Sequence, residues 1–162
     1  MAVDMFLKIT DIEGESADAK HKGSIDIESF SWGATQAVGT GAGGGAGAGK
    51  VQMQDFHFVM RSSKASPKLF LAAATGKHLK EAILTARKAG KEQIEFLKIK
   101  LTDILVSSYQ QAASADAPTP NDSFSLNFSK IEIDYVGQDP SGKIGESSRA
   151  EWSLKQSKAS EF

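Results

Sequence analysis

The sequence predicts a mainly β fold, a compact barrel of two antiparallel sheets with one short α-helix packed outside and a long glycine-rich loop. Four stretches alternate apolar and polar residues with period two, and each then switches which parity is apolar: 25–32, 51–60, 97–106 and 124–135. Alternation indicates a strand with one buried face, and each switch requires a bulge or a crossing between sheets. Several long bent strands predict a small closed barrel or a tightly wrapped sandwich.

The switches can be placed to within a few residues. In the first stretch Ile25 and Ile27 are followed by Phe30 and Trp32. The other apolar sets are Val51 and Met53 then Phe56, Phe58 and Met60; Leu97, Ile99 and Leu101 then Ile104 and Val106; and Phe124, Leu126 and Phe128 then Ile131, Ile133 and Tyr135. Each strand is therefore expected to change its direction or its sheet near the middle.

The remaining elements follow in chain order. Residues 3–9 form a first strand, 10–23 a loop, and 23–32 a second strand that ends at Gly33. A helix of about three turns begins at Ser66 as N-cap with Pro67 at its first position, and Gly76 ends it. Leu69, Phe70 and Ala73 would face the barrel by their three-and-four spacing.

A hairpin follows the helix, with strands over 82–88 and 91–109 around Ala89 and Gly90. Residues 112–122 form an exposed loop, residues 107–109 a strand that loses its apolar face, and the last strand carries Trp152 and Leu154. Neither a repeat nor a long linker divides the chain, so we expect one domain over residues 1–162.

A low-complexity loop interrupts this pattern after the second strand. Seven of its eleven residues are glycine: Gly39, Thr40, Gly41, Ala42, Gly43, Gly44, Gly45, Ala46, Gly47, Ala48 and Gly49. Such a loop is decoration or a contact that orders against a partner. Lys50 completes the spacing of a phosphate-binding loop, but Val51 replaces the hydroxyl residue that would hold magnesium, and a strand follows where a helix is needed. We expect no nucleotide binding.

Composition excludes several function classes. Nineteen basic and twenty acidic residues give a formal charge of −1 without a basic stripe, so nucleic acid is not an expected partner. The chain has no cysteine, which excludes disulfides, thiol catalysis and thiolate zinc sites. No apolar run approaches a membrane span, and the first residues lack the pattern of a signal peptide, so no membrane insertion is expected.

No residue pattern predicts catalysis, a metal or a cofactor. His21, His57 and His78 lie in different segments, and His57 should point away from the core because it alternates with Phe56 and Phe58. No nucleophile-elbow motif occurs. Four acidic residues have a spacing near that of a calcium loop but lack its closing glutamate, which indicates solvated surface: Asp11, Glu13, Glu15 and Asp18.

Several strings in fixed order nevertheless carry a resemblance that covers nearly the whole chain. They are Asp4 to Ile9, Gly14-Glu15-Ser16 followed by His21-Lys22, Phe30 to Gly33, Ser66 to Leu69, Leu105 to Tyr109, Ile131 to Tyr135 and Trp152 to Leu154. Together they resemble the haemolysin-coregulated protein family, Hcp. The Gly-Glu-Ser element and the Trp-Gly pair before the long loop are the most distinctive, and loops 39–49 and 112–122 match poorly.

The resemblance implies a structural subunit of the type VI secretion system inner tube and no enzyme. The implied partners are its own copies in hexameric rings that stack, the contractile sheath, baseplate and spike, and effector proteins carried in the lumen. It implies assembly in the bacterial cytoplasm and secretion through the type VI system. Ser31 has the parity opposite to Phe30 and Trp32, so it points away from the core, and the resemblance favours the lumen. Loop 39–49 is expected to contact the next ring.

Two other readings stay open from the residues alone. One is a monomeric ligand-binding barrel with the glycine-rich loop as a lid, and the other is a hydrolase with an unrecognised triad. A sizing measurement separates the tube subunit from both, because the chain itself has a mass of 17.3 kDa.

Overall fold

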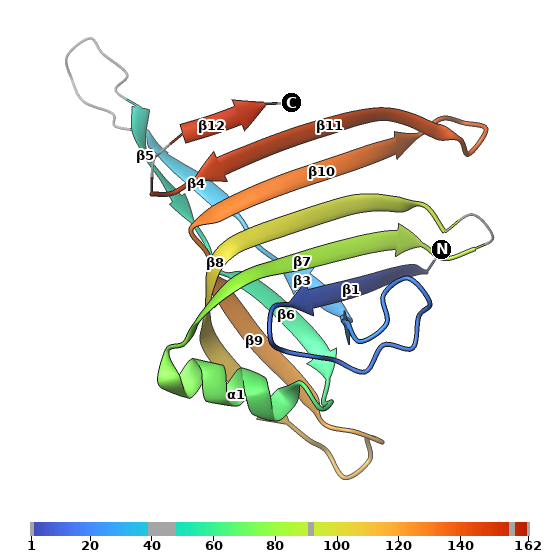
Figure 1. The fold of residues 1–162 in the computed structure, drawn as a ribbon, viewed down its shortest axis with the longest axis vertical. Helices are drawn as coiled ribbons and strands as arrows, with labels where there is room; N and C mark the ends of the chain where they lie inside the picture. Colours follow the sequence, from blue (N-terminus) through green and yellow to red (C-terminus); the bar gives the residue numbers. More distant parts are fainter. Residues whose placement is uncertain (1, 39–47, 91–92, 156–157, 162) are drawn as a thin grey trace.

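The structure is a computed structural model that describes residues 2–38, 48–90, 93–155 and 158–161 (Figure 1). Its elements are β1 (Val3–Ile9), β2 (Ile25–Asp26), β3 (Ser29–Ser31), β4 (Ala34–Val38), β5 (Ala48–Met53), β6 (Phe56–Arg61), α1 (Ser66–Thr75), β7 (His78–Lys88), β8 (Glu95–Ala112), β9 (Asn121–Asn127), β10 (Lys130–Gln138), β11 (Ile144–Ser153) and β12 (Lys158–Glu161). The fold is mainly β, as predicted.

Two layers share the long strand β8. The first half of β8 pairs with β7 and β10, which gives a first layer in the order β12, β11, β10, β8, β7, β1, β2. The second half of β8 pairs with β9, and β9, β6 and β3 continue a second layer. All of these pairings are antiparallel, and β6 and β9 cross the direction of the first-layer strands in Figure 1. Strands β4 and β5 form a separate hairpin.

The sheet wraps around the core without closing. Strands β2 and β3 are two ends of the hydrogen-bonded path, separated by Ile27 and Glu28. The Ile27 N–H donates to the Met5 carbonyl at 3.0 Å, and the Glu28 N–H donates to the Val59 carbonyl at 2.9 Å. One short segment thus connects β1 in the first layer to β6 in the second, so a wrapped sheet takes the place of a closed barrel.

The predicted parity switches coincide with breaks in the structure. Three of them fall between β2 and β3, between β5 and β6, and between β9 and β10. The fourth falls inside β8 at Asp103, whose φ of 53° places this non-glycine residue in the left-handed region. Such a kink sends the following side chains to the other face of the strand, as a bulge does.

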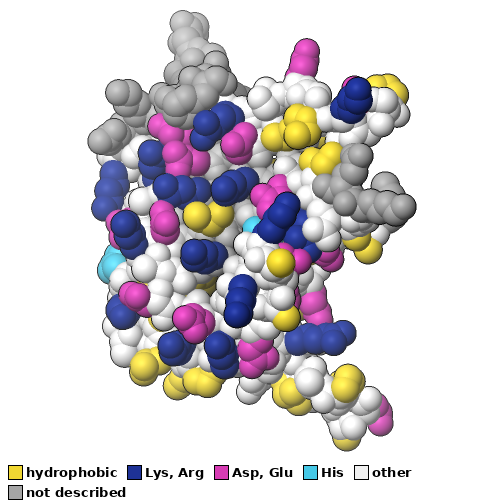
Figure 2. Space-filling model, turned by 45° about the vertical axis from the view of Figure 1, so that its right-hand side comes forward, with side chains coloured by type: hydrophobic (Ala, Val, Ile, Leu, Met, Phe, Trp, Pro, Cys, Tyr) yellow, Lys and Arg dark blue, Asp and Glu magenta, His cyan; other side chains and the backbone are white. Residues whose placement is uncertain are grey.

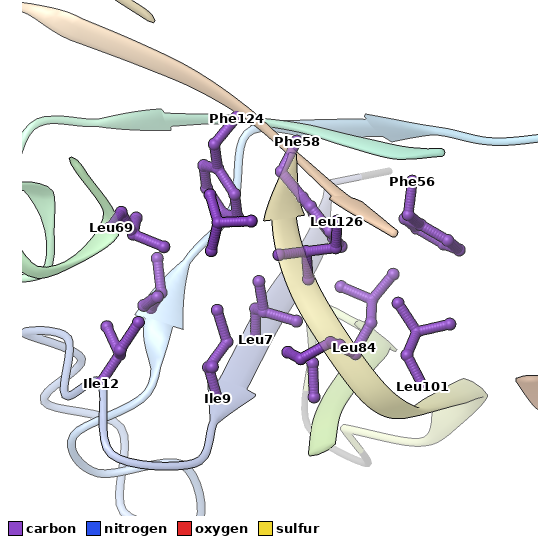
Figure 3. Close-up of a cluster of buried hydrophobic side chains, with 14 of the residues drawn as sticks. Leu7, Ile9, Ile12, Phe56, Phe58, Leu69, Leu84, Leu101, Phe124 and Leu126 are labelled. Atoms are coloured by element: carbon purple, nitrogen blue, oxygen red, sulfur yellow. The ribbon is translucent and has the colours of Figure 1, made fainter. Parts of the chain in front are cut away.

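The core lies between the two layers and is filled by side chains (Figure 3). The rings of Phe56, Phe58 and Phe124 form a stack with centroid separations of 5.0 and 5.2 Å, and all three are buried. Leu7, Leu84, Leu101 and Leu126 meet them from both layers. This packing opposes the reading of a barrel that holds a ligand inside.

Helix α1 occurs where the sequence predicts it, with two differences. Its N-cap is Ala65 rather than Ser66, and the Ser66 hydroxyl donates to the buried carboxylate of Asp122 instead of capping the helix. Phe70 is 57% exposed, and the helix packs through Leu69 and Ala72, with Ala73 partly buried. The C-cap is Gly76 with φ 65°, as predicted.

Other boundaries also differ from the expected ones. Strand β7 begins at His78, and β8 continues past Tyr109 to Ala112. Tyr135, which the alternation places in an apolar set, is 50% exposed. Within the described residues there is no helix with the length and hydrophobicity needed to cross a membrane. One domain over residues 1–162 stays a prediction.

Candidate assembly and cargo surfaces

Ser31 lies in a row of small polar side chains that crosses four strands. The pairing registers set Ser31 opposite His57, His57 opposite Ser125, and Ser125 opposite Ser108. Ser31, His57 and Ser108 are exposed, whereas Ser125 is buried. Ser31 therefore points away from the core, as the alternation predicts. A second row beside it consists of Ser29, Val59, Ser123 and Gln110. We call these eight residues the hydroxyl face.

A bulge in β8 creates part of this face. The register between β8 and β9 shifts between Val106 and Ser108, so Ser107 is the extra residue. The hydroxyls of Ser107 and Ser108 both lie within hydrogen-bond distance of the Ser125 hydroxyl, at 2.7 and 2.5 Å. The bulge therefore adds hydroxyls here, where the sequence had indicated only a strand losing its apolar face.

The hydroxyl face carries no carboxylate, lysine or arginine, and among the described residues the charged side chains next to it lie at its two ends. At one end Asp55 accepts hydrogen bonds from Ser107 at 2.7 Å and Asn127 at 3.0 Å. At the other end Arg61 pairs with Glu28 at 3.1 Å. Between them a depression of about 330 Å³ is lined by His57, Phe58, Val59, Ser108, Gln110, Ser123 and Phe124. A surface of this kind suits contacts with other proteins because few charges need to lose their water.

Aromatic packing fixes the strand that carries Ser31. The rings of Phe30 and Trp32 lie 5.6 and 5.7 Å from the ring of Phe56. The next residue, Gly33, approaches Gln54 closely, since a Cβ at this glycine would lie 3.2 Å from the Gln54 side-chain oxygen. The Gln54 N–H donates to the Gly33 carbonyl at 2.8 Å. These contacts anchor the base of the β4–β5 hairpin beside the hydroxyl face.

The glycine-rich loop joins β4 to β5. Ala48 and Gly49 are the first residues of β5, and residues 39–47 lie outside the described residues. Lys50 and Val51 lie within β5, so a strand follows the glycines, as predicted, and the helix N-terminus of a phosphate-binding loop is missing at this position.

One carboxylate is buried inside the second layer. Asp122 of β9 is fully buried and accepts hydrogen bonds from Ser62 at 2.6 Å, Tyr109 at 2.9 Å and Gln111 at 3.1 Å, as well as from Ser66. Burial raises the pKa of this carboxyl, but the four donors outweigh burial and leave the pKa below its usual value. Asp122 therefore ties the start of α1 to β8 and β9 as a charged acceptor.

The outward face of the first layer is rich in charged side chains, in contrast to the hydroxyl face. Lys100 lies 3.4 Å from Glu81 and 3.9 Å from Glu132, and Lys130 lies 3.5 Å from Glu151. Figure 2 shows a face on which basic and acidic side chains are interspersed in this way. We call the following residues of β1, β7, β8, β10 and β11 the charged face: Lys8, Glu81, Lys98, Lys100, Lys130, Glu132, Asp134, Arg149 and Glu151.

The remaining titratable candidates serve structural contacts. Arg87 is buried and pairs with Asp18 and Asp4, and it holds the pKa of Asp18 at about 2. Glu13 pairs with Lys64 at the surface at 3.5 Å, whereas Asp18 differs from the predicted solvated surface because it is half-buried against Arg87. The three histidines lie apart, and the described residues contain no cluster suited to a metal ion. Lys155, Ser129 and His78 donate to Asp103 and hold its pKa at about 2.

The class that the structure defines is a mainly β protein with a wrapped antiparallel sheet, a filled core and two outward faces of contrasting chemistry. Comparison with known proteins identifies the family. The family described as "Type VI secretion system effector, Hcp" matches residues 6–135. Protein hcp1 of Pseudomonas aeruginosa is 42% identical over 158 residues, covering 96% of this chain and 98% of that protein. The chain belongs to the Hcp family of type VI secretion proteins.

Solved structures agree with this assignment. A structure described as a type six secretion system protein superposes with a TM-score of 0.92 at 30% identity, covering 98% of this chain and all of that one. Hcp1 from Salmonella typhimurium gives a TM-score of 0.84 at 36% identity, with 99% and 100% covered. The resemblance read from the sequence strings is confirmed, and with it a structural role in the type VI secretion tube.

Proposed function

We propose that six copies of this chain form a ring, that rings stack into the inner tube, and that the hydroxyl face lines the lumen. The observation that carries the last step is the row of Ser31, His57, Ser125 and Ser108, which contains no carboxylate, lysine or arginine. Repeated around a ring, such a row gives a neutral band that can contact varied effector proteins without leaving a buried charge unpaired.

The other partners follow from the family. The tube is assembled in the bacterial cytoplasm and leaves the cell through the type VI system, in contact with the contractile sheath, the baseplate and the spike. The role is structural, with no catalytic step. Light scattering tests the ring directly, because six copies of a 17.3 kDa chain make about 104 kDa. A monomer at micromolar concentration contradicts the proposal.

The cargo role is tested by Ser31→Glu. This change places six like charges around the lumen and should abolish the recovery of effector proteins with the ring, while light scattering still shows hexamers. Ser148→Glu is the matched control, because Ser148 is an exposed serine of β11 outside the hydroxyl face. If a verified Ser31→Glu ring recovers effector proteins as well as the unchanged ring does, the hydroxyl face does not line the lumen.

The loop between β4 and β5 is proposed to contact the next ring. Its sequence has no side chain larger than threonine, so it adds little to the subunit core, and ordering it at a contact costs conformational entropy. Deleting residues 42–48 should leave rings intact and abolish tubes in electron micrographs. Loss of the rings themselves would show that the loop supports the subunit.

A further inference from the structure

Four lysines, two of them members of the charged face, surround one small depression at the edge of that face. The depression has a volume of about 180 Å³ and lies between strands β1, β7 and β8 and the loop that joins β1 to β2. Lys8 and Lys98 reach it from the strands, and Lys20 and Lys22 reach it from the loop. We call it the lysine pocket. It has one carboxylate in its lining, that of Glu95.

Among the described residues these lysines differ from their neighbours because they form no ion pair. Within the part of the chain that the structure describes, no carboxylate lies within 4 Å of the ammonium groups of Lys8, Lys20, Lys22 or Lys98. Lys100, in the next row of the sheet, pairs with both Glu81 and Glu132. The carboxylate of Glu95 is engaged by His21 at 2.8 Å. Unpaired like charges around one depression repel each other, and an anion placed between them would relieve this.

The loop that carries two of the lysines is held firmly. Arg87 pairs with Asp18, and its guanidinium lies 4.9 Å from the centre of the Phe6 ring. The His21 ring also stacks on Phe6, with the two ring centres 4.5 Å apart. The Lys20 N–H donates to the Asp18 carboxylate at 3.0 Å. Lys20 and Lys22 flank His21 in the sequence, so their backbone positions over the depression are fixed before any ligand arrives.

We propose that the lysine pocket binds a compact oxyanion with at least two negative charges, of which a phosphate group, free or on a small molecule, is the type. Lysine ammonium groups suit phosphate as point charges. A long polyanion fits less well, because Glu81, Glu132 and Asp134 on the same face would lie under its path. The site is separate from the hydroxyl face and goes beyond the tube function proposed above.

Calorimetric titration of the purified ring with pyrophosphate tests the proposal. Ionic strength is held constant with sodium chloride, because exposed charges are screened within about 10 Å at 0.1 M salt. We expect saturable binding at one site per subunit. Removing one lysine charge should weaken it by at least about fivefold, which is the effect of a unit charge on a single ligand charge about 4 Å away in water. Lys98→Gln should weaken pyrophosphate binding by one such factor, and the double change Lys20→Gln with Lys22→Gln should weaken it by that factor twice over.

Two further variants sharpen the test. Lys68→Gln is the matched control, since Lys68 is an exposed lysine of α1 outside the pocket, and its affinity should equal that of the unchanged protein. Glu95→Gln removes the one carboxylate of the lining and should tighten binding. Inorganic phosphate and a nucleoside monophosphate, titrated separately, distinguish a free anion from a phosphate group on a small molecule.

Several results would overturn the proposal. These are no saturable binding of pyrophosphate, equal affinity in the double lysine variant, or an equal loss in Lys68→Gln, which would indicate a diffuse effect of net charge. Tighter binding of duplex DNA than of pyrophosphate would indicate a long polyanion instead. Light scattering on every variant shows whether the ring is intact, so failure of the pocket is distinguished from failure of the proposed assembly.

Discussion

The two outward faces of this protein cover the same core and have opposite chemistry. On the hydroxyl face, a row across four strands reads Ser31, His57, Ser125 and Ser108. On the charged face, the corresponding row includes Lys8, Lys100, Glu132 and Glu151. The core fixes only the inward side of each strand, so the outward side is free to suit its surroundings. A neutral face favours close protein contact, and a face of mixed charge favours solubility.

The buried polar groups sharpen this contrast. In the second layer the carboxylate of Asp122 is buried. It accepts hydrogen bonds from four neutral side chains: Ser62, Ser66, Tyr109 and Gln111. The first layer places its carboxylates outside, opposite lysines. A charge held by four neutral donors is satisfied without a cation, but each donor depends on it. The second layer should therefore lose more stability than the first when one charged side chain is removed.

The largest expected effect is that of Asp122→Ala. This change leaves several buried donors without an acceptor and should lower the free energy of unfolding by about 3 kcal/mol. Asp122→Asn, which keeps one oxygen acceptor, should cost clearly less. Urea unfolding followed by tryptophan fluorescence measures both. A loss below about 1 kcal/mol for Asp122→Ala would show that the cluster does not hold α1 in place.

A smaller, pH-dependent effect is expected for Asp18. Its pKa in the folded protein is about 2, against an ordinary 3.8, because Arg87 favours the ionised carboxyl. The pair therefore stabilises the folded state above about pH 4, and this contribution is lost as the pH falls towards 2. Asp18→Asn should melt below the unchanged protein at pH 7, and the gap should narrow between pH 4 and pH 2.

The hydroxyl face supplies the control for this measurement. Ser123→Ala changes an exposed residue without a charge, so any difference in its melting temperature should stay constant over the same pH range. A gap for Asp18→Asn that also stays constant would mean that the ion pair with Arg87 does not stabilise the fold.

The smallest effect is expected on the charged face itself. Lys100→Met breaks ion pairs of 3.4 and 3.9 Å in which the lysine side chain is 43% exposed, so it should cost less than about 1 kcal/mol. The cost should fall further in 1 M sodium chloride. A loss comparable to that of Asp122→Ala in chemical unfolding would remove the proposed difference between the two layers.

The alternation of apolar and polar residues was enough to predict most of the fold and one residue of the candidate site, Ser31. It predicted the direction of Ser31 and His57 and the positions of the four breaks, because apolar side chains on a strand must face the core. It could not align the strands, so the row that adds Ser125 and Ser108 was missed. The alternating Ser123 and Ser125 beside Phe124 and Leu126 were the available indication that β9 carries hydroxyls outward.

The rest depended on contacts between distant residues. The bulge at Ser107 follows from pairing with β9, and the role of Ser66 follows from Asp122, which lies 56 positions further along the chain. The lysine pocket also joins positions from 8 to 98, which is why the sequence shows no basic stripe. Phe70 was misplaced because helical spacing alone does not say which edge of an apolar stripe meets the sheet.

Distance measurement between spin labels tests most directly whether the hydroxyl face lines the lumen. The chain has no cysteine, so Ser31→Cys and Lys100→Cys can each be labelled at one site. In a ring of six, the separation of equivalent positions in neighbouring subunits equals their distance from the axis. We expect a shorter separation for Ser31 than for Lys100 in hexamers verified by light scattering. A shorter separation for Lys100 would place the charged face in the lumen and contradict the account.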